Sequence, residues 1–330
     1  MGILGAGTVG AAFLRLLERH GGVDVSAVLV RDVAKARDVG TWRPRFTDDP
    51  DLVLDGVDVL VELIGGVDEA TELVARAADS GARVVSANKA ALAEGWKRWG
   101  PWVRGGRVGF EAAVMAGTPV VGPLAGALRG SRPIALHALL NGTCAFVIDR
   151  MEGGMDAAEA LAEAQRLGYA EADPSIDVAG VDAAHKLCIL ARLAFDPEMP
   201  WGRVASGVRG IRDLDARAVR REVARGRRVR LVASIWGGGD GWRTAVRPVV
   251  VPESHPLVLV GSGRNALAFT GDAVGDVLIA GAGAGADTTA SAVLADVLDA
   301  LDDRPGPRPL AHAAPVPPFG SDDDPLEEWG

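Results

Sequence analysis

The feature that most constrains this chain is a glycine pattern within its first ten residues. The sequence opens MGILGAGTVG, where Gly5, Gly7 and Gly10 form G-x-G-x-x-G directly after the apolar residues Ile3 and Leu4. An amphipathic stretch follows, so we expect the pattern to lie between a β-strand and an α-helix. Glycines there permit a tight turn and a close backbone approach to phosphate, which the helix N-terminus attracts. The pattern predicts a dinucleotide-binding turn rather than a purely structural one.

The next apolar run, VDVSAVLVRD, bears on the choice of cofactor. It is predicted to be a strand that ends at Arg31 and Asp32. An acidic residue at this point commonly binds the ribose 2′-hydroxyl, whereas an arginine accommodates a 2′-phosphate. Neighbouring residues on a strand point to opposite faces, so only one of the two need face the ribose. The sequence leaves open which one does, and therefore whether NAD or NADP is preferred.

Strands and helices alternate through the first third of the chain. The segments VDVLVELIGG, ARVVSANKAALAEG and GRVGFEAAVMAG each begin as a buried strand and run into a turn. This alternation predicts an α/β fold with a Rossmann-type, doubly wound parallel sheet. Ligands of such sheets lie at the carboxyl ends of the strands. The residues expected to line the cofactor site are Gly5, Gly7, Thr8, Val9, Gly10, Arg31, Ile64, Gly65, Lys89 and Glu111.

The pattern changes near residue 120 and predicts a second, α+β domain. MDAAEALAEAQRLG begins with Asp156, followed three residues later by Glu159, which indicates a capping box, and it ends at Gly168. Alternating runs between residues 228 and 280 predict antiparallel strands and a broad sheet for subunit contact.

These patterns divide the chain. We expect a dinucleotide-binding domain at residues 1–119, completed by a helix at 286–303 that follows a second glycine loop. A catalytic and dimerisation domain is expected at 120–285. Residues 304–330 are proline-rich and end in acidic residues, so we expect this tail to be disordered.

The stretch LGYAEADPSIDVAGVDAAHK concentrates carboxylates and one lysine before an apolar helix. Asp182 and Lys186 are four residues apart and share a helix face. On a solvated face such a pair is a salt bridge worth ~0.3–0.5 kcal/mol. The helix is otherwise apolar, and the preceding turn adds Asp173 and Asp177, so the pair is expected at a buried or cleft-lining end. A partly desolvated lysine there can serve as a general acid or base, while His185 is expected to pack.

Composition excludes several classes of function. A net charge of −9 without a basic run argues against binding of nucleic acid or of anionic membranes. Two cysteines give neither a disulfide framework nor metal spacing, which fits a reducing cytoplasm. No apolar run reaches ~18 residues, so no transmembrane span is expected, and the opening residues do not predict a signal peptide. NGT at Asn141 matches the N-glycosylation motif, but this motif has no meaning in a protein that is expected to be cytosolic.

Several motifs together resemble homoserine dehydrogenase. They are GAGTVG, VELIGG, SANKA, FEAAVMAGTPVVGPL, LNGTC, LAEAQRLGYAEADPSIDVAGVDAAHKL and GDAVGDVLIAGAGAG, in that order over nearly the whole chain. The resemblance implies an NAD- or NADP-dependent oxidoreductase that interconverts aspartate 4-semialdehyde and homoserine, in the pathway to threonine and methionine. It also implies a homodimer with a small-molecule substrate.

The resemblance assigns roles to individual residues. It implies that Glu171 binds substrate, that Asp182 orients it and that Lys186 donates the proton. Lys89 is implied at the edge of cofactor and substrate, and Asp177 is a second choice for substrate binding. The resemblance further implies nucleotide contacts at Gly168 and Gly285, and a sodium site formed by Glu111 with the backbone carbonyls of Val114, Ala116 and Thr118.

The sequence differs from the family in two respects, and it is compatible with two alternative functions. The first strand, MGIL, is shorter than the family's usual one, and no regulatory domain is expected after the catalytic one. The same site could serve another amino-aldehyde, or the chain could be a catalytically inactive nucleotide-binding protein. We expect NADP to be accepted through Arg31, with NAD remaining usable.

Overall fold

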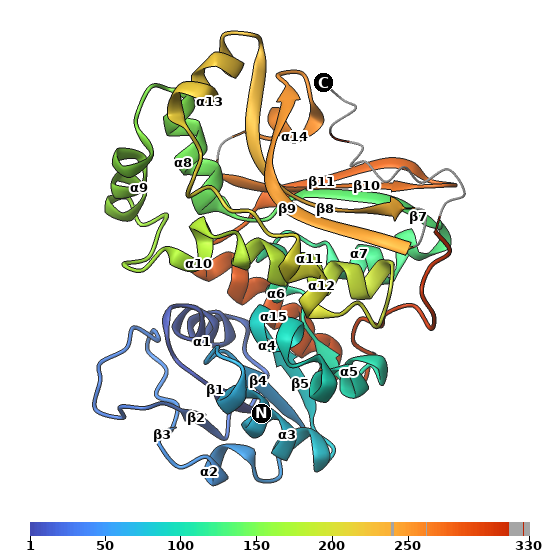
Figure 1. Ribbon diagram of the computed structural model, residues 1–330. Helices are drawn as coiled ribbons and strands as arrows, with labels where there is room; N and C mark the ends of the chain where they lie inside the picture. Colours follow the sequence, from blue (N-terminus) through green and yellow to red (C-terminus); the bar gives the residue numbers. More distant parts are fainter. Residues whose placement is uncertain (239–240, 262, 317–325, 327–330) are drawn as a thin grey trace. The chain divides into compact units, whose positions relative to one another are not determined.

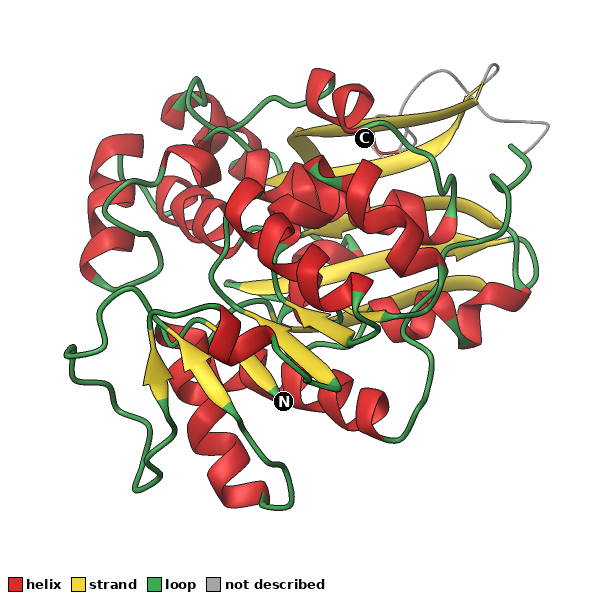
Figure 2. Ribbon diagram, turned by 90° about the horizontal axis from the view of Figure 1, so that it is seen from below, coloured by secondary structure: helices red, strands yellow, loops and turns green. Residues whose placement is uncertain are grey.

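The computed structural model describes residues 1–238, 241–261, 263–316 and 326. The chain divides into two compact units. Unit 1 comprises residues 1–126 and 284–309, and unit 2 comprises residues 127–283 and 310–330. Figure 1 follows the chain through both units, and Figure 2 shows its helices, strands and loops.

Unit 1 is built on a six-stranded parallel sheet in the order β3-β2-β1-β4-β5-β6. The first strand lies inside the sheet, where Ile3 pairs with Val28 on one side and with Val61 on the other. The chain therefore winds outward in two directions, which is the Rossmann arrangement and confirms the predicted fold class. The strands are β1 Gly2–Leu4, β2 Ala27–Leu29, β3 Phe46–Thr47, β4 Val59–Glu62, β5 Arg83–Ser86 and β6 Val108–Gly109.

Two helices from opposite ends of the sequence share the core of unit 1. Helix α1 buries Phe13 and Leu17, and α15 buries Val293 and Val297 in the same hydrophobic cluster. Burial of such side chains stabilises a domain by ~1.5–3 kcal/mol each, so α15 is an integral part of this unit. The helices of unit 1 are α1 Thr8–His20, α2 Asp51–Leu54, α3 Asp68–Asp79, α4 Lys89–Glu94, α5 Trp96–Arg104, α6 Ala112–Met115, α7 Val121–Ala125 and α15 Ala286–Leu301.

Unit 2 contains a five-stranded antiparallel sheet in the order β11-β10-β7-β8-β9, as the alternating runs predict. Helix α11 packs on β8 of this sheet and is buried along nearly its whole length (Figure 1). The strands are β7 Pro133–Leu139, β8 Arg227–Gly238, β9 Gly241–Pro252, β10 Arg264–Gly271 and β11 Gly275–Ala282. The helices are α8 Gly142–Glu152, α9 Ala157–Arg166, α10 Ser175–Val178, α11 Val181–Ala194, α12 Trp201–Ser206, α13 Ala216–Val223 and α14 Pro256–Leu259, with a 3₁₀ turn at Ala127–Gly130.

Two predictions about the ends of helix α9 are confirmed by the structure. Helix α9 begins with the predicted capping box, in which the Asp156 side chain and the Glu159 side chain each accept the other's backbone N–H. Gly168 follows the helix with a φ of 80°, the left-handed conformation expected of a helix-ending glycine. Among the described residues, no helix is long and apolar enough to cross a lipid bilayer.

The tail after residue 303 differs in part from the prediction of disorder. Residues 304–316 are described, and Ala314 is buried in unit 2. The Ala314 N–H donates to the Phe195 carbonyl at 2.6 Å, and Trp242 Nε1 donates to the Ala314 carbonyl at 3.0 Å. This part of the tail is fixed by backbone groups that a composition argument does not consider. Residues 317–325 and 327–330 lie outside the described residues.

Candidate active site

The predicted glycine turn connects β1 to α1. Gly5 has a φ of 97°, and a Cβ on it would lie 2.8 Å from the Leu63 carbonyl oxygen. A Cβ on Gly10 would lie 2.3 Å from the Gly5 carbonyl oxygen. Gly7 is the N-cap of α1. The first N–H groups of that helix, beginning at Thr8, therefore lie at this turn and have no acceptor within the helix. The turn therefore requires glycine for close approach, as a dinucleotide-binding turn does.

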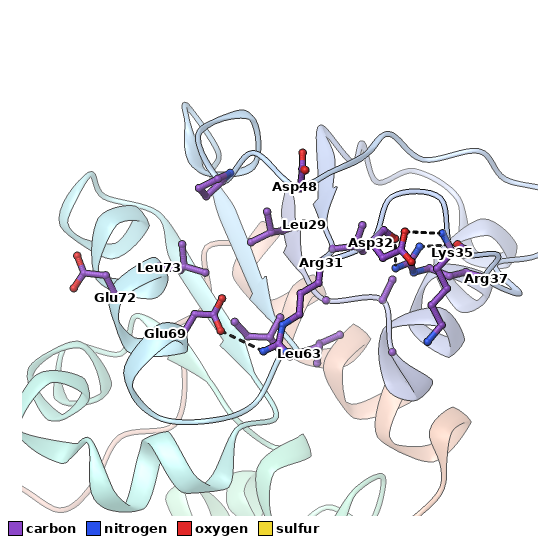
Figure 3. Close-up of a pocket in the computed structure, with 16 residues that line it drawn as sticks. Leu29, Arg31, Asp32, Lys35, Arg37, Asp48, Leu63, Glu69, Glu72 and Leu73 are labelled. Carbon is purple, nitrogen blue, oxygen red and sulfur yellow. Dashed lines mark hydrogen bonds and ion pairs between the residues drawn. The ribbon is translucent and has the colours of Figure 1, made fainter.

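A pocket of about 820 Å³ lies beside this turn. Its lining includes Gly5 and Gly7 of the turn, Leu29 at the end of β2, Val30 after it, and Ile64 after β4. The residues come from the carboxyl ends of three neighbouring parallel strands, where ligands of such sheets bind (Figure 3).

Arg31 and Asp32 both line this pocket, but not on a strand. The prediction that β2 ends at these two residues is wrong, because the strand ends at Leu29. The Asp32 carboxylate accepts the backbone N–H groups of Ala34 and Lys35 at 2.9 and 3.2 Å, which makes a turn there. The Asp32 carboxylate is therefore engaged by its own turn, and it is this turn, not the alternation of a strand, that makes the surroundings of Arg31 and Asp32 different.

The Arg31 side chain is 88% exposed and makes one long ion pair, from Nη2 to Glu69 Oε2 at 3.4 Å. An ion pair this exposed is worth at most ~1 kcal/mol, so it leaves the guanidinium available to a ligand. Figure 3 shows Arg31 directed towards Glu69, and Asp32 beside Lys35 and Arg37. Lys35 and Arg37 also line the pocket and add positive charge to the part around Asp32.

A buried glutamate that the sequence analysis missed organises the rim after β4. Glu62 Oε1 accepts the N–H groups of Ile64 and Gly65, both at 3.0 Å, and Oε2 accepts the Ser86 hydroxyl at 2.6 Å. Burial raises the pKa of the Glu62 carboxyl, against the lowering effect of these hydrogen bonds. Glu62 therefore fixes the loop after β4 to the end of β5. A glutamate inside the apolar run VDVLVELIGG was the available signal.

Lys89 is the first residue of α4, whose start is held by Asn88. Asn88 Oδ1 accepts the Ala91 N–H at 3.0 Å, and its Nδ2 donates to the Gly66 carbonyl at 2.6 Å. These bonds join the loops after β4 and β5, so Lys89 lies at the carboxyl edge of the unit 1 sheet, as expected.

Glu111 lies at the start of α6, also in unit 1, with its carboxylate directed at the start of α7. Oε1 accepts the N–H groups of Val120 and Val121 at 2.7 and 2.9 Å, and Oε2 accepts that of Gly122 at 2.7 Å. An ionised carboxylate oxygen has two acceptor positions, so Oε2 retains one. The other three members of the predicted cation site, Val114, Ala116 and Thr118, lie in the segment between Glu111 and Val120.

The four predicted ligands are one carboxylate and three backbone carbonyls, and oxygen donors of this kind suit a hard cation. Ala116 adopts a φ of 51°, unusual for a residue with a Cβ, so this turn is strained. The Glu111 N–H donates to Asp296 Oδ2 of α15 at 2.9 Å, and burial raises the pKa of Asp296 to about 7. Within the described ranges, no cluster of three or more His, Cys, Asp or Glu side chains is arranged to hold a metal ion.

The predicted Asp182–Lys186 pair is present in unit 2 and is buried. Lys186 Nζ donates to Asp182 Oδ2 at 2.9 Å and to the Leu140 carbonyl at 2.7 Å. The two side chains are 11% and 8% exposed, so the alternative of a solvated helical salt bridge is wrong. The pair lies in the first turns of α11, whose N-cap, Gly180, is left-handed with a φ of 81°.

Asn141 joins this pair to a second carboxylate. Its Nδ2 donates to Asp182 Oδ2 at 2.9 Å and to Asp177 Oδ1 at 2.8 Å, while its Oδ1 caps α8 by accepting the Cys144 N–H. The Thr143 hydroxyl donates to the Tyr169 carbonyl at 2.6 Å and approaches Asp177 Oδ2 at 3.4 Å. Asn141 and Thr143 were not predicted as site residues, although NGT shows an N-cap pattern between a strand and a helix.

Glu171 and Gly168 lie in the segment between α9 and α10. The Glu171 side chain is exposed, and its backbone carbonyl accepts a hydrogen bond from Gln165 Nε2 at 3.2 Å. Asp173 accepts the Ser175 N–H at 3.0 Å, and hydrogen bonds from Ser175 lower the pKa of the Asp173 carboxyl. His185 stacks on Trp201 with ring centroids 4.7 Å apart, which agrees with the packing role expected of it.

A Rossmann-type unit with a glycine turn, together with a unit that carries a buried lysine–carboxylate site, has the parts that an NAD(P)-dependent oxidoreductase requires. Comparison with known proteins identifies the family. The family model "Homoserine dehydrogenase, NAD binding domain" matches residues 5–98, and the model "Homoserine dehydrogenase" matches residues 119–298. The chain belongs to the homoserine dehydrogenase family.

Individual relatives agree with this assignment. The chain is 38% identical to a homoserine dehydrogenase of Neisseria gonorrhoeae, over 91% of this chain and 71% of the relative. Identity to that of Corynebacterium glutamicum is 36%, over 96% of this chain and 76% of the relative. The solved structure of the Thiobacillus denitrificans homoserine dehydrogenase is similar with a TM-score of 0.85 at 38% identity, covering 91% of this chain and 72% of that one. A hyperthermophilic archaeal homoserine dehydrogenase solved with NADPH has a TM-score of 0.77 at 28% identity, covering 93% and 98%.

Proposed function

We propose that the protein interconverts L-homoserine and L-aspartate 4-semialdehyde, with Lys186 as the proton donor and acceptor. The observation that carries the proposal is the buried hydrogen-bonded site in which Lys186, Asp182, Asn141 and Asp177 are joined. Such a site, in a member of this family, holds the charges and donors that a small amino-acid substrate requires.

The geometry of Lys186 supports the proton-transfer role. An ammonium group has three N–H donors. Two are directed at Asp182 Oδ2 and the Leu140 carbonyl, and the third is left for the substrate oxygen. During reduction, Lys186 gives a proton from Nζ to the aldehyde oxygen; during oxidation, neutral Nζ takes the proton of the hydroxyl group. The nicotinamide cofactor, when bound, supplies or accepts the hydride.

The carboxylates of Asp177 and Glu171 suit the ammonium group of the substrate. Asp177 lies in α10 and is joined to Asp182 through Asn141, whereas Glu171 lies in the segment between α9 and α10. A carboxylate binds an ammonium by charge-assisted hydrogen bonds. Asp182, held by Asn141 and Lys186, orients the lysine and the substrate oxygen. Asp177 and Glu171 thus bind the substrate ammonium, and Asp182 positions Lys186 and the substrate oxygen.

We propose that NADP is accepted through Arg31 and that NAD remains usable. Arg31 lines the unit 1 pocket with an exposed guanidinium, and an archaeal relative was solved with NADPH. Asp32 is held by the N–H groups of its own turn, so its carboxylate is less able to repel a phosphate. The proposed nucleotide contacts are Gly5, Gly7, Thr8, Val9, Gly10, Arg31, Ile64, Gly65, Lys89, Gly168 and Gly285; the proposed sodium ligands are Glu111, Val114, Ala116 and Thr118.

The remaining proposals concern assembly, location and domain organisation. The antiparallel sheet of unit 2 supports a homodimer that uses this sheet for subunit contact. Both cysteines are buried free thiols, which supports a reducing, cytoplasmic location. We retain a nucleotide-binding domain at 1–119 with 286–303, and a catalytic domain at 120–285.

A spectrophotometric assay tests the proposed function. Purified protein is mixed with homoserine and either NADP or NAD at alkaline pH, and formation of the reduced cofactor is followed. We expect turnover with homoserine. Cofactor binding without turnover would favour an inactive nucleotide-binding protein, and turnover with a different amino alcohol alone would favour another amino-aldehyde as substrate.

A further inference from the structure

A buried asparagine on β10 shares a hydrogen-bond acceptor with Lys186. Asn265 Nδ2 donates to the Leu140 carbonyl at 3.4 Å, and Lys186 Nζ donates to the same oxygen at 2.7 Å. The pairing of β10 with β7 sets Ala266 opposite Leu139, so Asn265 reaches the carbonyl that follows the end of β7. Asn265 is 1% exposed, so little water can replace it.

The shared carbonyl belongs to the short junction between β7 and α8, which consists of Leu140 and Asn141. Neither the sheet nor the helix includes Leu140, and its carbonyl accepts from two side chains, Lys186 Nζ and Asn265 Nδ2. A lysine side chain has four flexible bonds, and its ammonium direction depends on its acceptors. The Leu140 carbonyl and Asp182 together set the direction of the third N–H of Lys186. Asn265 donates to that carbonyl and so helps to hold it in place.

The surroundings of Asn265 fix its side-chain amide. A Cβ on Gly283 would lie 2.0 Å from Asn265 Cγ, so the Gly283 backbone lies close to the amide group and leaves no space for a side chain there. Asn265 Oδ1 is buried without a hydrogen-bond partner among the described residues. Turning the amide over would set Oδ1 against the Leu140 oxygen, and two acceptors repel. The contact from Nδ2 to the Leu140 oxygen, at 3.4 Å, therefore favours this orientation of the amide over the reverse one.

We propose that Asn265 is a positioning residue for the proton transfer by Lys186. It acts through the Leu140 carbonyl and does not touch the reacting atoms. The proposal rests on the proposed function of Lys186. It assigns to β10, far from Lys186 in sequence, a share in the geometry of the proton donor.

Asn265→Leu tests the proposal, because leucine keeps the branched shape against Gly283 and removes both polar atoms. We expect kcat with homoserine to fall about fivefold to tenfold, the usual effect of one hydrogen bond, with KM for homoserine within about twofold. Gly283→Ala is a second variant that keeps the chemistry of Asn265 and displaces its amide, and it should lower kcat in the same direction. The matched control is Ser234→Ala, which removes a buried hydroxyl bonded to His137 Nδ1 at 3.0 Å in the same sheet and should leave kcat unchanged.

A double-mutant cycle separates positioning from general support of the fold. In a Lys186→Ala background, Asn265→Leu should have no further effect on kcat, because the group that it positions is gone. The same loss of kcat in both backgrounds, or an unchanged kcat in the single variant, would overturn the proposal. Absence of homoserine turnover in the unsubstituted protein would overturn the proposed function as well, and that outcome is read before any Asn265 variant is measured.

Discussion

Replacing Lys186 with methionine should lower stability and activity together, and a second substitution should separate them. Methionine fills most of the space of the lysine without its charge. It leaves the Asp182 carboxylate, whose side chain is 8% exposed, without its ion-pair partner. The structure therefore predicts a buried carboxylate that has lost its ion pair.

The magnitude follows from the contacts that remain. Removing one partner of a buried pair costs about 3–5 kcal/mol. Asn141 Nδ2 still donates to Asp182 Oδ2 at 2.9 Å, and a hydrogen bond to a charged group is worth ~1.5–3 kcal/mol. We therefore expect the free energy of unfolding to fall by about 3 kcal/mol, at the lower end of the range. Adding Asp182→Asn removes the buried charge and should restore about 2 kcal/mol of the loss, within the ~1–3 kcal/mol cost of a buried group that has lost its partner.

The assay is urea unfolding at neutral pH, followed by tryptophan fluorescence, with kcat for homoserine measured on the same preparations. We expect both Lys186→Met and the double variant Asp182→Asn/Lys186→Met to have kcat reduced by about 100-fold or more. Recovery of kcat along with stability in the double variant would show that the pair serves the fold and not the chemistry. Unchanged stability in Lys186→Met would refute the buried ion pair itself.

Two further predictions concern unit 1. Arg31→Ala should raise KM for NADP about tenfold, equivalent to about 1.4 kcal/mol, with little change for NAD; equal effects on both cofactors would mean that Arg31 does not bind the 2′-phosphate. Burial raises the pKa of Glu62, so this group stabilises the fold most at low pH, and the contribution is lost as the pH rises through the folded-state pKa. Glu62→Gln should therefore gain Tm relative to the unsubstituted protein as the pH is raised from about 5 to about 9; a constant difference across that range would contradict the assignment.

Features encoded by neighbouring residues could be predicted from the sequence. The glycine turn, the capping box at Asp156 and the apolar helix with Asp182 and Lys186 each depend on spacings of a few residues. The i, i+4 spacing predicted that the pair shares one helix face, and the apolar neighbours predicted its burial. Strand–helix alternation was enough for the parallel sheet.

Features that depend on backbone atoms or distant strands were not predictable in the same way. The Leu140 carbonyl has no residue-type signature, and Asn265 reaches it only because β10 pairs with β7. The predicted end of β2 lies two to three residues beyond the observed one, because Asp32 forms a turn with the amides of its own loop. A two-residue strand such as β3 is too short to show periodicity.

The role of Lys186 as proton carrier is tested most directly by chemical rescue of Lys186→Ala with small primary amines. Lys186→Ala should reduce kcat by about 100-fold or more, with cofactor affinity nearly unchanged. Because alanine leaves a space where the buried side chain was, methylamine should enter and raise kcat in a saturable, concentration-dependent way. Lys186→Met, which fills the space, should show no such response. A Lys186→Ala variant that keeps more than about a tenth of the original kcat, or that binds cofactor and substrate but is not rescued by any amine, would contradict the assignment of proton transfer to Lys186.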